Sequence, residues 1–361
     1  MGSSSREGPE SRVRIAGLGC ASPDYCIDQE EALEHLVKHY GAELTDHSLE
    51  LLEQFLAHPS IQRRHFAIRD PEELFTEDPD ARMERFAASA TELGARASRL
   101  ALEKAGATPS DVVALVVNTC TGYLCPGISN YLIEELGLRK DIPAYDLVGS
   151  GCGGAVPNLE MCRPLATKNP DGVVLSISVE ICSATFQMSD DPALLLSNAL
   201  FGDGAAAAVL RRGRGELELG PSLRLHEPRY RDDIRYVYRN GQLHNQLTIS
   251  LPAKSSRVVN KLVEQFLDEN RLRAADIQHW ALHPGGEKII NRLGEKIGLS
   301  EKQLQPVRDV LREYGNLSSV SVWFVLRRIM ETGTTPEDRF MMLSFGAGLS
   351  AHAILLGRKS E

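Results

Sequence analysis

Short apolar runs and longer amphipathic stretches alternate along the chain. The runs are rich in Val, Ile and Ala, which is typical of buried strands, and they occupy residues 13–19, 112–118, 144–148, 172–178 and 205–211. Helical spacing of apolar residues is present at 28–39, 45–57 and about 82–105. A hairpin is predicted over 235–251, turning at Asn240-Gly241. Strands that alternate with helices predict an α/β fold with a mainly parallel core sheet.

The chain carries the same order of motifs twice. The segment "PSDVVALVVNTCTG" (109–122) resembles "AADIQHWALHPGG" (274–286), and "FGDGAAAAVLR" (201–211) resembles "FGAGLSAHAILLGR" (345–358). Two matches in the same order predict an internal duplication. We therefore expect a disordered tail or expression-tag remnant, an N-terminal half and a C-terminal half, at residues 1–12, 13–214 and 215–361.

The duplication places three chemically active side chains at comparable points. The separation from Asp111 to Cys152 is 41 residues and that from Asp276 to Asn316 is 40, and both segments end beside a glycine just before a predicted helix. His283 follows the strand-like run of the second half. Loops at the C-terminal ends of strands meet at one edge of an α/β unit. We therefore expect Cys152, His283 and Asn316 to converge where the halves pack together.

Each of these residue types also has a simpler explanation. A cysteine among glycines can be a small buried apolar side chain, although a helix N-terminus would stabilise its thiolate. A histidine can be a hydrogen-bonded core residue, and an asparagine before a helix is commonly an N-cap. The combination of all three at comparable points favours catalysis.

Composition excludes several classes of function. The net charge is −9 with both signs mixed along the chain, so no basic stripe is present for nucleic acid. No apolar run is long enough to span a bilayer, and the polar N-terminus lacks the apolar segment of a signal peptide. The seven cysteines form no C-x-x-C pair and no zinc-spaced cluster with histidine. These features predict reduced thiols, no metal and a cytoplasmic location.

Four motifs together carry a family resemblance. "GCGGA", "LFGDGAA", "HPGG" and "EYGNLSS" resemble the type III polyketide synthases, the chalcone and stilbene synthase-like enzymes of the thiolase superfamily, in their bacterial form. The resemblance runs from about Val13 to Gly357. It implies a five-layered αβαβα fold built from two repeated halves. It also implies a homodimer without a metal, a redox cofactor or any permanently bound cofactor, acting on coenzyme A thioesters.

The resemblance also implies catalytic roles. Cys152 would accept the acyl starter from a coenzyme A thioester, since sulfur both attacks and leaves readily. His283 would hold Cys152 as a thiolate and, with Asn316, hydrogen-bond the thioester carbonyl of malonyl-CoA. These donors would stabilise the enolate left by decarboxylation, which then attacks the acyl group. The backbone N–H of Cys152 would stabilise the oxyanion.

Further residues are implied to shape the substrate cavity. Phe201 resembles a gatekeeper phenylalanine, whose alternative is a core aromatic. Ile249 stands near a second gatekeeper phenylalanine of the plant enzymes, where it would widen the cavity mouth. Cys182 replaces a pocket threonine, as in bacterial members that accept long acyl chains, and its alternative is a buried packing residue. Ser197 is expected beside it. Cys125 replaces a methionine that reaches across the plant dimer.

Other positions depart from the plant pattern. The loop "SFGAG" (344–348) retains Gly346 and Gly348, which would shape the chain behind Cys152, but lacks the family's proline. The family's basic residues for coenzyme A phosphates are unmatched, with Arg63 and Arg64 nearby, for which surface ion pairs are the alternative. Either other residues hold coenzyme A or an acyl carrier protein delivers the starter.

The sequence thus favours iterative decarboxylative condensation of malonyl-CoA onto an acyl starter, followed by cyclisation. A long-chain starter giving alkylpyrones or alkylresorcinols is the suggested case. The alternatives are a ketoacyl synthase III-like enzyme that condenses once, against which "HPGG" argues, and a catalytically silent thiolase-fold scaffold or binding protein. The starter, the number of extensions and the cyclisation mode depend on cavity shape, which sequence does not provide.

Overall fold

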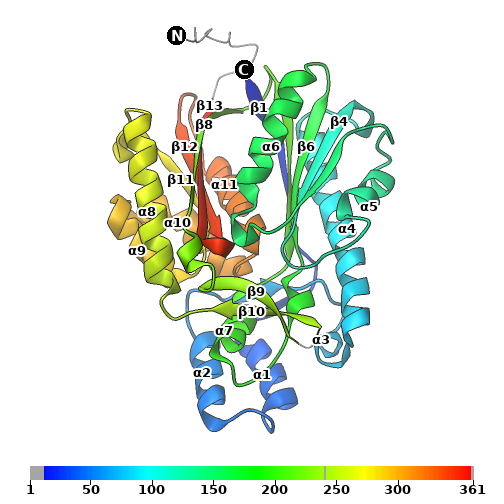
Figure 1. Ribbon diagram of the computed structural model, residues 1–361, viewed down its shortest axis with the longest axis vertical. Helices are drawn as coiled ribbons and strands as arrows, with labels where there is room; N and C mark the ends of the chain where they lie inside the picture. The colour runs from blue at the N-terminus through cyan, green and yellow to red at the C-terminus, as the bar shows by residue number, and fades with distance from the viewer. Residues whose placement is uncertain (1–11, 240, 359–361) are drawn as a thin grey trace.

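The computed structural model describes residues 12–239 and 241–358, in which helices and sheet strands form five layers (Figure 1). Within these residues, nine strands form one sheet in the order β11-β12-β13-β8-β1-β7-β6-β4-β5. The strands of the N-terminal half are β1 (Val13–Ala21), β4 (Val112–Asn118), β5 (Ala144–Leu147), β6 (Val173–Glu180) and β7 (Gly204–Arg212). Those of the C-terminal half are β8 (Leu217–His226), β11 (His279–Leu282), β12 (Arg339–Gly346) and β13 (Ser350–Arg358).

The two halves of the sheet have mirrored strand orders. Outward from the centre, β1-β7-β6-β4 on one side corresponds to β8-β13-β12-β11 on the other, and β1 and β8 join them. Each half also places a short capped turn before the equivalent strand, at Pro109–Asp111 and Ala274–Asp276. The internal duplication is therefore visible in the topology, whereas the exact boundary at residues 214 and 215 stays a prediction.

The expectation of a mainly parallel sheet is wrong. Among the described strands, β4 runs parallel to β5 and to β6, and β11 runs parallel to β12, but the other five neighbouring pairs are antiparallel. The physical reason is clearest at β12 and β13, where three residues connect the strands. So short a connection suits only antiparallel neighbours.

Helices form the other three layers. The outer layer of the N-terminal half contains α4 (Pro79–Lys104) and α5 (Ile128–Glu135), and that of the C-terminal half contains α8 (Leu251–Glu269), α9 (Glu287–Ile297) and α10 (Glu301–Tyr314). The central layer contains α6 (Ala155–Lys168) and α11 (Ser321–Glu331). Helix α6 contacts strands of both sheet halves, and α11 is buried almost all round, as expected for a central helix.

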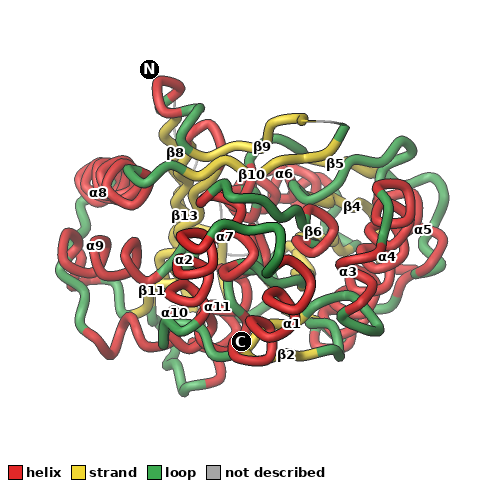
Figure 2. The backbone as a smooth tube through the Cα atoms, turned by 90° about the horizontal axis from the view of Figure 1, so that it is seen from below, coloured by secondary structure: helices red, strands yellow, loops and turns green. Residues whose placement is uncertain are grey.

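A smaller group of elements covers one end of the layers. It consists of α1 (Gln29–Tyr40), α2 (Asp46–Leu56), α3 (Glu72–Thr76), α7 (Pro192–Leu200), and the strand pairs β2 (Cys26–Asp28) with β3 (Arg63–His65) and β9 (Ile234–Arg239) with β10 (Gln242–Leu247). Figure 2 views this end directly, with α1, α2 and α7 between the two outer helix layers. The predicted hairpin is β9–β10, although Asn240 lies outside the described residues, as do residues 1–11 of the predicted tail.

None of the helices in the described part of the chain combines the length and apolar character needed to cross a bilayer. All seven cysteines lie within the described ranges and are free thiols.

Candidate active site

Cys152 lies in a tight turn that begins a central helix. It occupies a 3-10 turn, Gly151–Gly153, directly before α6, and Gly151 has a φ of +54°, which favours glycine. Gly346 lies directly behind this turn, because a Cβ on it would be 2.8 Å from the nitrogen of Cys152 and 2.5 Å from that of Gly153. The hydroxyl of Ser344 donates to the carbonyl of Gly153 (2.9 Å). The C-terminal half thus supports the turn that carries Cys152.

His283 and Asn316 come from the C-terminal half. His283 follows β11, packs edge-on against Phe345 at 5.0 Å between ring centroids, and is 1% exposed. In the described structure its Nδ1 has no hydrogen-bond partner. Asn316 Oδ1 accepts the backbone N–H of Ser318 (2.8 Å), as a capping asparagine does. With its oxygen engaged locally, the side-chain NH₂ group of Asn316 is available for another acceptor.

The three candidate residues line one cavity of about 330 Å³. Phe201 and Ile249 line the same cavity, and most of the remaining lining side chains are apolar. Cys152 is 8% exposed and is thus a buried part of the cavity lining. The structure therefore brings Cys152, His283 and Asn316 together around one space large enough for a small organic molecule.

Burial favours neutral forms of the two titratable groups. It raises the pKa of the Cys152 thiol to about 12, against the opposing effect of the hydroxyl of Ser318, which donates to Sγ (3.3 Å). Burial also lowers the pKa of His283 to about 3. No hydrogen bond joins Cys152 to His283 within the described residues. That His283 holds Cys152 as a thiolate thus stays a prediction, and among the described residues Ser318 is the neighbour whose hydroxyl bonds to the sulfur.

Comparison with known proteins places this geometry in a family. Residues 3–213 match the family described as "Chalcone and stilbene synthases, N-terminal domain", and residues 228–359 match the corresponding C-terminal domain. The chain is 30% identical to a 3,5-dihydroxyphenylacetyl-CoA synthase of Streptomyces toyocaensis, over 96% of this chain and 90% of the relative. The chain belongs to the chalcone and stilbene synthase family. It is a type III polyketide synthase, an acyl-transferring enzyme of a family that uses coenzyme A thioesters.

Solved structures agree with this assignment. PKS-I from the brown alga Ectocarpus siliculosus matches with a TM-score of 0.88 and 29% identity, over 96% of this chain and 98% of the alga's. The type III polyketide synthase domain of Steely1 from Dictyostelium matches with a TM-score of 0.87 over 97% of this chain and 100% of the domain, and at 24% identity it supports the fold alone. The fold inferred from the motifs is confirmed.

Polar residues that were not predicted from the sequence surround Cys152 in this synthase. Ser318 has a φ of +51°, unusual for a residue with a side chain, and its hydroxyl lies 3.2 Å from the sulfur of Cys120 as well as against Cys152. Glu180 is fully buried, and burial raises its pKa. It accepts hydrogen bonds from Ser319 and from the backbone of Cys120. The serine pair at the end of "YGNLSS" was the available signal.

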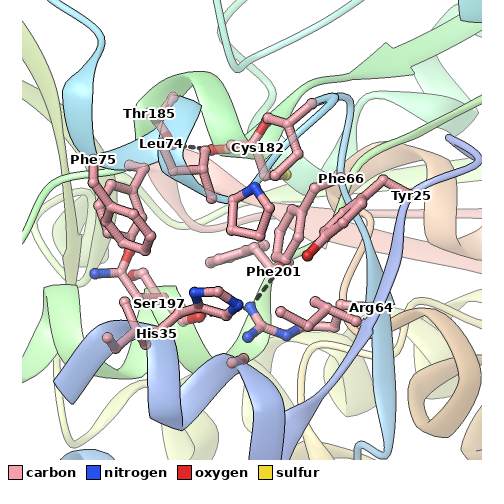
Figure 3. A pocket seen from close by; sticks show the side chains of 18 of the residues that line it. Tyr25, His35, Arg64, Phe66, Leu74, Phe75, Cys182, Thr185, Ser197 and Phe201 are labelled. Atoms are coloured by element: carbon pink, nitrogen blue, oxygen red, sulfur yellow. Dashed lines mark hydrogen bonds between the residues drawn. The ribbon is translucent and has the colours of Figure 1, made fainter. Parts of the chain in front are cut away.

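A second cavity of the synthase, drawn in Figure 3, shares Phe201 with the first. It is narrow, about 60 Å³, and is lined mainly by apolar and aromatic side chains of α1, α3, α7 and neighbouring loops. Cys182 and Ser197 line this second cavity, not the first. Phe201 lines both, so its ring forms part of the wall between them. The structure thus divides the sequence-predicted pocket residues between two spaces.

The remaining candidates have different surroundings. Arg64 is buried and bonds to Gln29, so it is not available to coenzyme A phosphates at the surface, and that expectation is corrected. Arg63 and Cys125 are exposed and line neither cavity of the described structure. Ile249 is 99% exposed at the mouth of the first cavity.

Two further features concern cofactors. Lys288, at the start of α9, is the one basic side chain other than histidine that lines the first cavity in the described structure. Among the described residues, no group of three or more His, Cys, Asp or Glu side chains is arranged to hold a metal ion.

Proposed function

We propose that Cys152, His283 and Asn316 catalyse iterative decarboxylative condensation of malonyl-CoA onto an acyl starter. The observation that carries this proposal is that the three line one largely apolar cavity. In the loading step Cys152 Sγ attacks the thioester carbonyl while its proton passes to His283. Because burial favours the neutral thiol and imidazole, the transfer accompanies the attack. The coenzyme A thiolate then leaves and takes up that proton.

The condensation step uses the same cavity. The carboxylate of malonyl-CoA leaves as carbon dioxide, and its electron pair forms an enolate whose oxygen is hydrogen-bonded by Asn316 Nδ2 and His283. The enolate carbon attacks the acyl carbonyl on Cys152, the C–S bond breaks, and the extended chain leaves on coenzyme A. The backbone N–H of Cys152 stabilises the intermediate oxyanion. Reloading the product onto Cys152 permits another cycle before cyclisation.

The second cavity is an argument for a long acyl starter. Its lining is apolar and meets the first cavity at Phe201, so a shift of that ring would let an alkyl chain extend past Cys182 and Ser197. Alkylpyrones or alkylresorcinols are the corresponding products. The relative from Streptomyces is named for an aromatic acyl-CoA product, which would not need this second space.

A homodimer and a cytoplasmic location complete the proposal. Strand β5 is at one edge of the sheet, and exposed apolar side chains lie along it and nearby, at Tyr123, Tyr145, Val148 and Met161. Cys125 belongs to the loop beside them, where it would face the partner. Free thiols favour a reducing compartment. Lys288 is positioned for the phosphates of coenzyme A or of an acyl carrier protein's phosphopantetheine.

The test is product analysis with purified protein, malonyl-CoA and a panel of short, aromatic and long-chain acyl-CoAs. Pyrones or resorcinols should form with the wild type, and Cys152→Ala should release carbon dioxide without extending the chain. Asn316→Ala should lose both activities. A single-extension product would instead identify a ketoacyl synthase-like enzyme, and no turnover with any starter would identify a silent thiolase-fold protein.

A further inference from the structure

The C-terminal end of helix α7 lies directly before the shared wall residue Phe201. The last carbonyls of a helix have no partner within the helix and need donors from elsewhere. Three segments distant in sequence supply these donors, α1 with Gln29, β3 with Arg64 and the turn of Asn316. The bonds are Arg64 Nη1 to Asn198 O (2.5 Å) and to Phe201 O (3.0 Å), Gln29 Nε2 to Ala199 O (3.0 Å), and Asn316 N to Leu200 O (2.9 Å).

Arg64 and Gln29 act as one buried unit. Arg64 is 2% exposed and Gln29 is 5% exposed, and Arg64 Nε donates to Gln29 Oε1 (2.8 Å). In the described part of the chain Arg64 forms no ion pair with a carboxylate. The negative end of the α7 dipole, the two carbonyls and the more distant charge of buried Asp203 compensate its charge. A buried arginine is thereby held in one orientation by backbone acceptors.

The same arginine contacts the segment that carries Asn316. A Cβ on Gly315, whose φ is +68°, would lie 2.9 Å from Arg64 Cγ and 2.7 Å from Leu200 O. The segments are also joined by a β-bridge between Phe201 and Asn316, in which Gly202 N donates to Asn316 O (3.1 Å). Figure 3 shows the guanidinium of Arg64 directed at Phe201. One side chain therefore contacts both the wall of the cavities and the turn of Asn316.

We propose that the Arg64–Gln29 pair is a positioning device that fixes Phe201 and Asn316 relative to each other, and so couples decarboxylation to chain extension. The inference rests on the proposed function. Asn316 holds the enolate oxygen, whereas Phe201 forms the wall against which the acyl chain on Cys152 lies. Carbon–carbon bond formation requires the enolate within attack distance of the acyl carbonyl. If the two supports move independently, the enolate forms but is protonated before it attacks.

The experiment measures carbon dioxide released per carbon–carbon bond formed, with malonyl-CoA and the best starter. This ratio does not depend on how much protein is folded, so a merely structural role would leave it unchanged. Arg64→Lys keeps the charge but cannot bond Gln29, Asn198 and Phe201 together, and we expect it to raise the ratio about tenfold. Gln29→Ala removes the bond to Ala199 and should raise the ratio by a smaller factor.

Arg163→Lys is the matched control. Arg163 is a partly buried arginine that also donates to a backbone carbonyl, that of Gly220 (2.7 Å), but it lines neither cavity, so its variant should keep the wild-type ratio. An unchanged ratio in both Arg64→Lys and Gln29→Ala would overturn the inference. If Arg64→Lys does not fold, the ratio measured for Gln29→Ala alone tests the inference. A wild-type protein that makes no Cys152-dependent product would overturn the proposed function itself, together with this inference.

Discussion

Two turns occupy comparable places in the two halves of the molecule. The turn of Cys152 precedes central helix α6, and the turn that begins at Asn316 precedes central helix α11. Each is entered through a glycine with positive φ, Gly151 at +54° and Gly315 at +68°. The duplicated fold thus presents two loops to one cavity from opposite sides.

The two turns differ in what supports them. The turn of Cys152 rests on the strand ends of the other half, through Gly346 and Ser344. The turn of Asn316 rests on the end elements outside the duplicated core, through Leu200 and Arg64. The symmetry of the fold therefore sets where the two loops lie, whereas the thiol of Cys152 and the amide of Asn316 set which chemistry each loop can perform.

The largest effect should come from removing the space behind Cys152. Gly346 has a φ of −172°, which any residue adopts, so only space requires glycine there. In Gly346→Ala the new Cβ would meet three backbone atoms at 2.8 Å or less, including the nitrogen of Cys152. We expect a loss of about 3 kcal/mol in the free energy of unfolding and a loss of condensation of about 100-fold. Urea unfolding and product assays measure both.

Gly348→Ala is the control for that experiment. Gly348 has a φ of +87°, but no atom lies within 4 Å of the position that a methyl group would take there, so alanine costs only backbone strain, about 1 kcal/mol. A near-equal loss of condensation in the two variants would show that the condensation rate depends on the conformation of the loop and not on the close contact with Cys152.

The second prediction concerns the support of the turn of Asn316. Gly315→Ala would place a methyl group 2.7 Å from the carbonyl oxygen of Leu200 and displace the turn of Asn316. We expect decarboxylation of malonyl-CoA to fall by roughly 10- to 100-fold. Alkylation of Cys152 by iodoacetamide should fall by a smaller factor, because Gly346 and Ser344 keep its own turn in place and only the bond from Ser318 is displaced. An equal loss of malonyl-CoA decarboxylation and of Cys152 alkylation would mean that the two turns are not independently supported.

The positions of the reacting side chains could be inferred from the sequence, whereas their protonation states could not. Cys152 and Asn316 end segments of near-equal length in a duplicated chain, so their convergence follows from topology. The pKa of Cys152 depends on burial by residues far away in sequence, which no local motif contains. The resting form of Cys152 therefore depends on the balance between the helix N-terminus, which favours the thiolate, and burial, which raises the pKa of the thiol.

Arg64 illustrates a second limit. An arginine in a polar segment is normally solvated, and its burial here depends on the carbonyls of α7, more than 130 residues later in the chain. The direction of the central strands was missed for a related reason. Local apolar patterns identify strands but do not say which strands become neighbours.

The third prediction concerns a side chain that reaches from one turn to the other. Ser318 belongs to the turn of Asn316, yet its hydroxyl lowers the pKa of Cys152 against the larger effect of burial. Because that pKa is about 12, wild-type alkylation should rise about tenfold per pH unit from pH 7 to pH 10. Ser318→Ala should slow alkylation at pH 8 by about tenfold, one pKa unit.

Ser319→Ala is the matched control, because that hydroxyl donates to Glu180 and not to the sulfur. It should change the alkylation rate of Cys152 by much less than Ser318→Ala does, because Ser319 affects the sulfur only through the charge of Glu180. A wild-type rate that is already constant above pH 7 would show that the thiolate is the resting form and that burial does not control this site.

The smallest effect concerns His352, which lies behind the turn of Cys152. A Cβ on Gly153 would lie 3.4 Å from its ring, and burial, with smaller effects of His226 and Arg224, lowers its pKa to about 4. Unfolding exposes a histidine of ordinary pKa near 6.5, so the unfolded chain binds the extra proton and stability falls as pH drops from about 6.5 to 4.

His352→Gln cannot take up that proton. Its free energy of unfolding in urea should therefore fall less steeply over this range, by about 1 kcal/mol per pH unit. His283 and the carboxylates contribute equally to both proteins. An identical slope would therefore mean that His352 binds its proton as readily in the folded as in the unfolded chain, so that its burial does not make stability depend on pH.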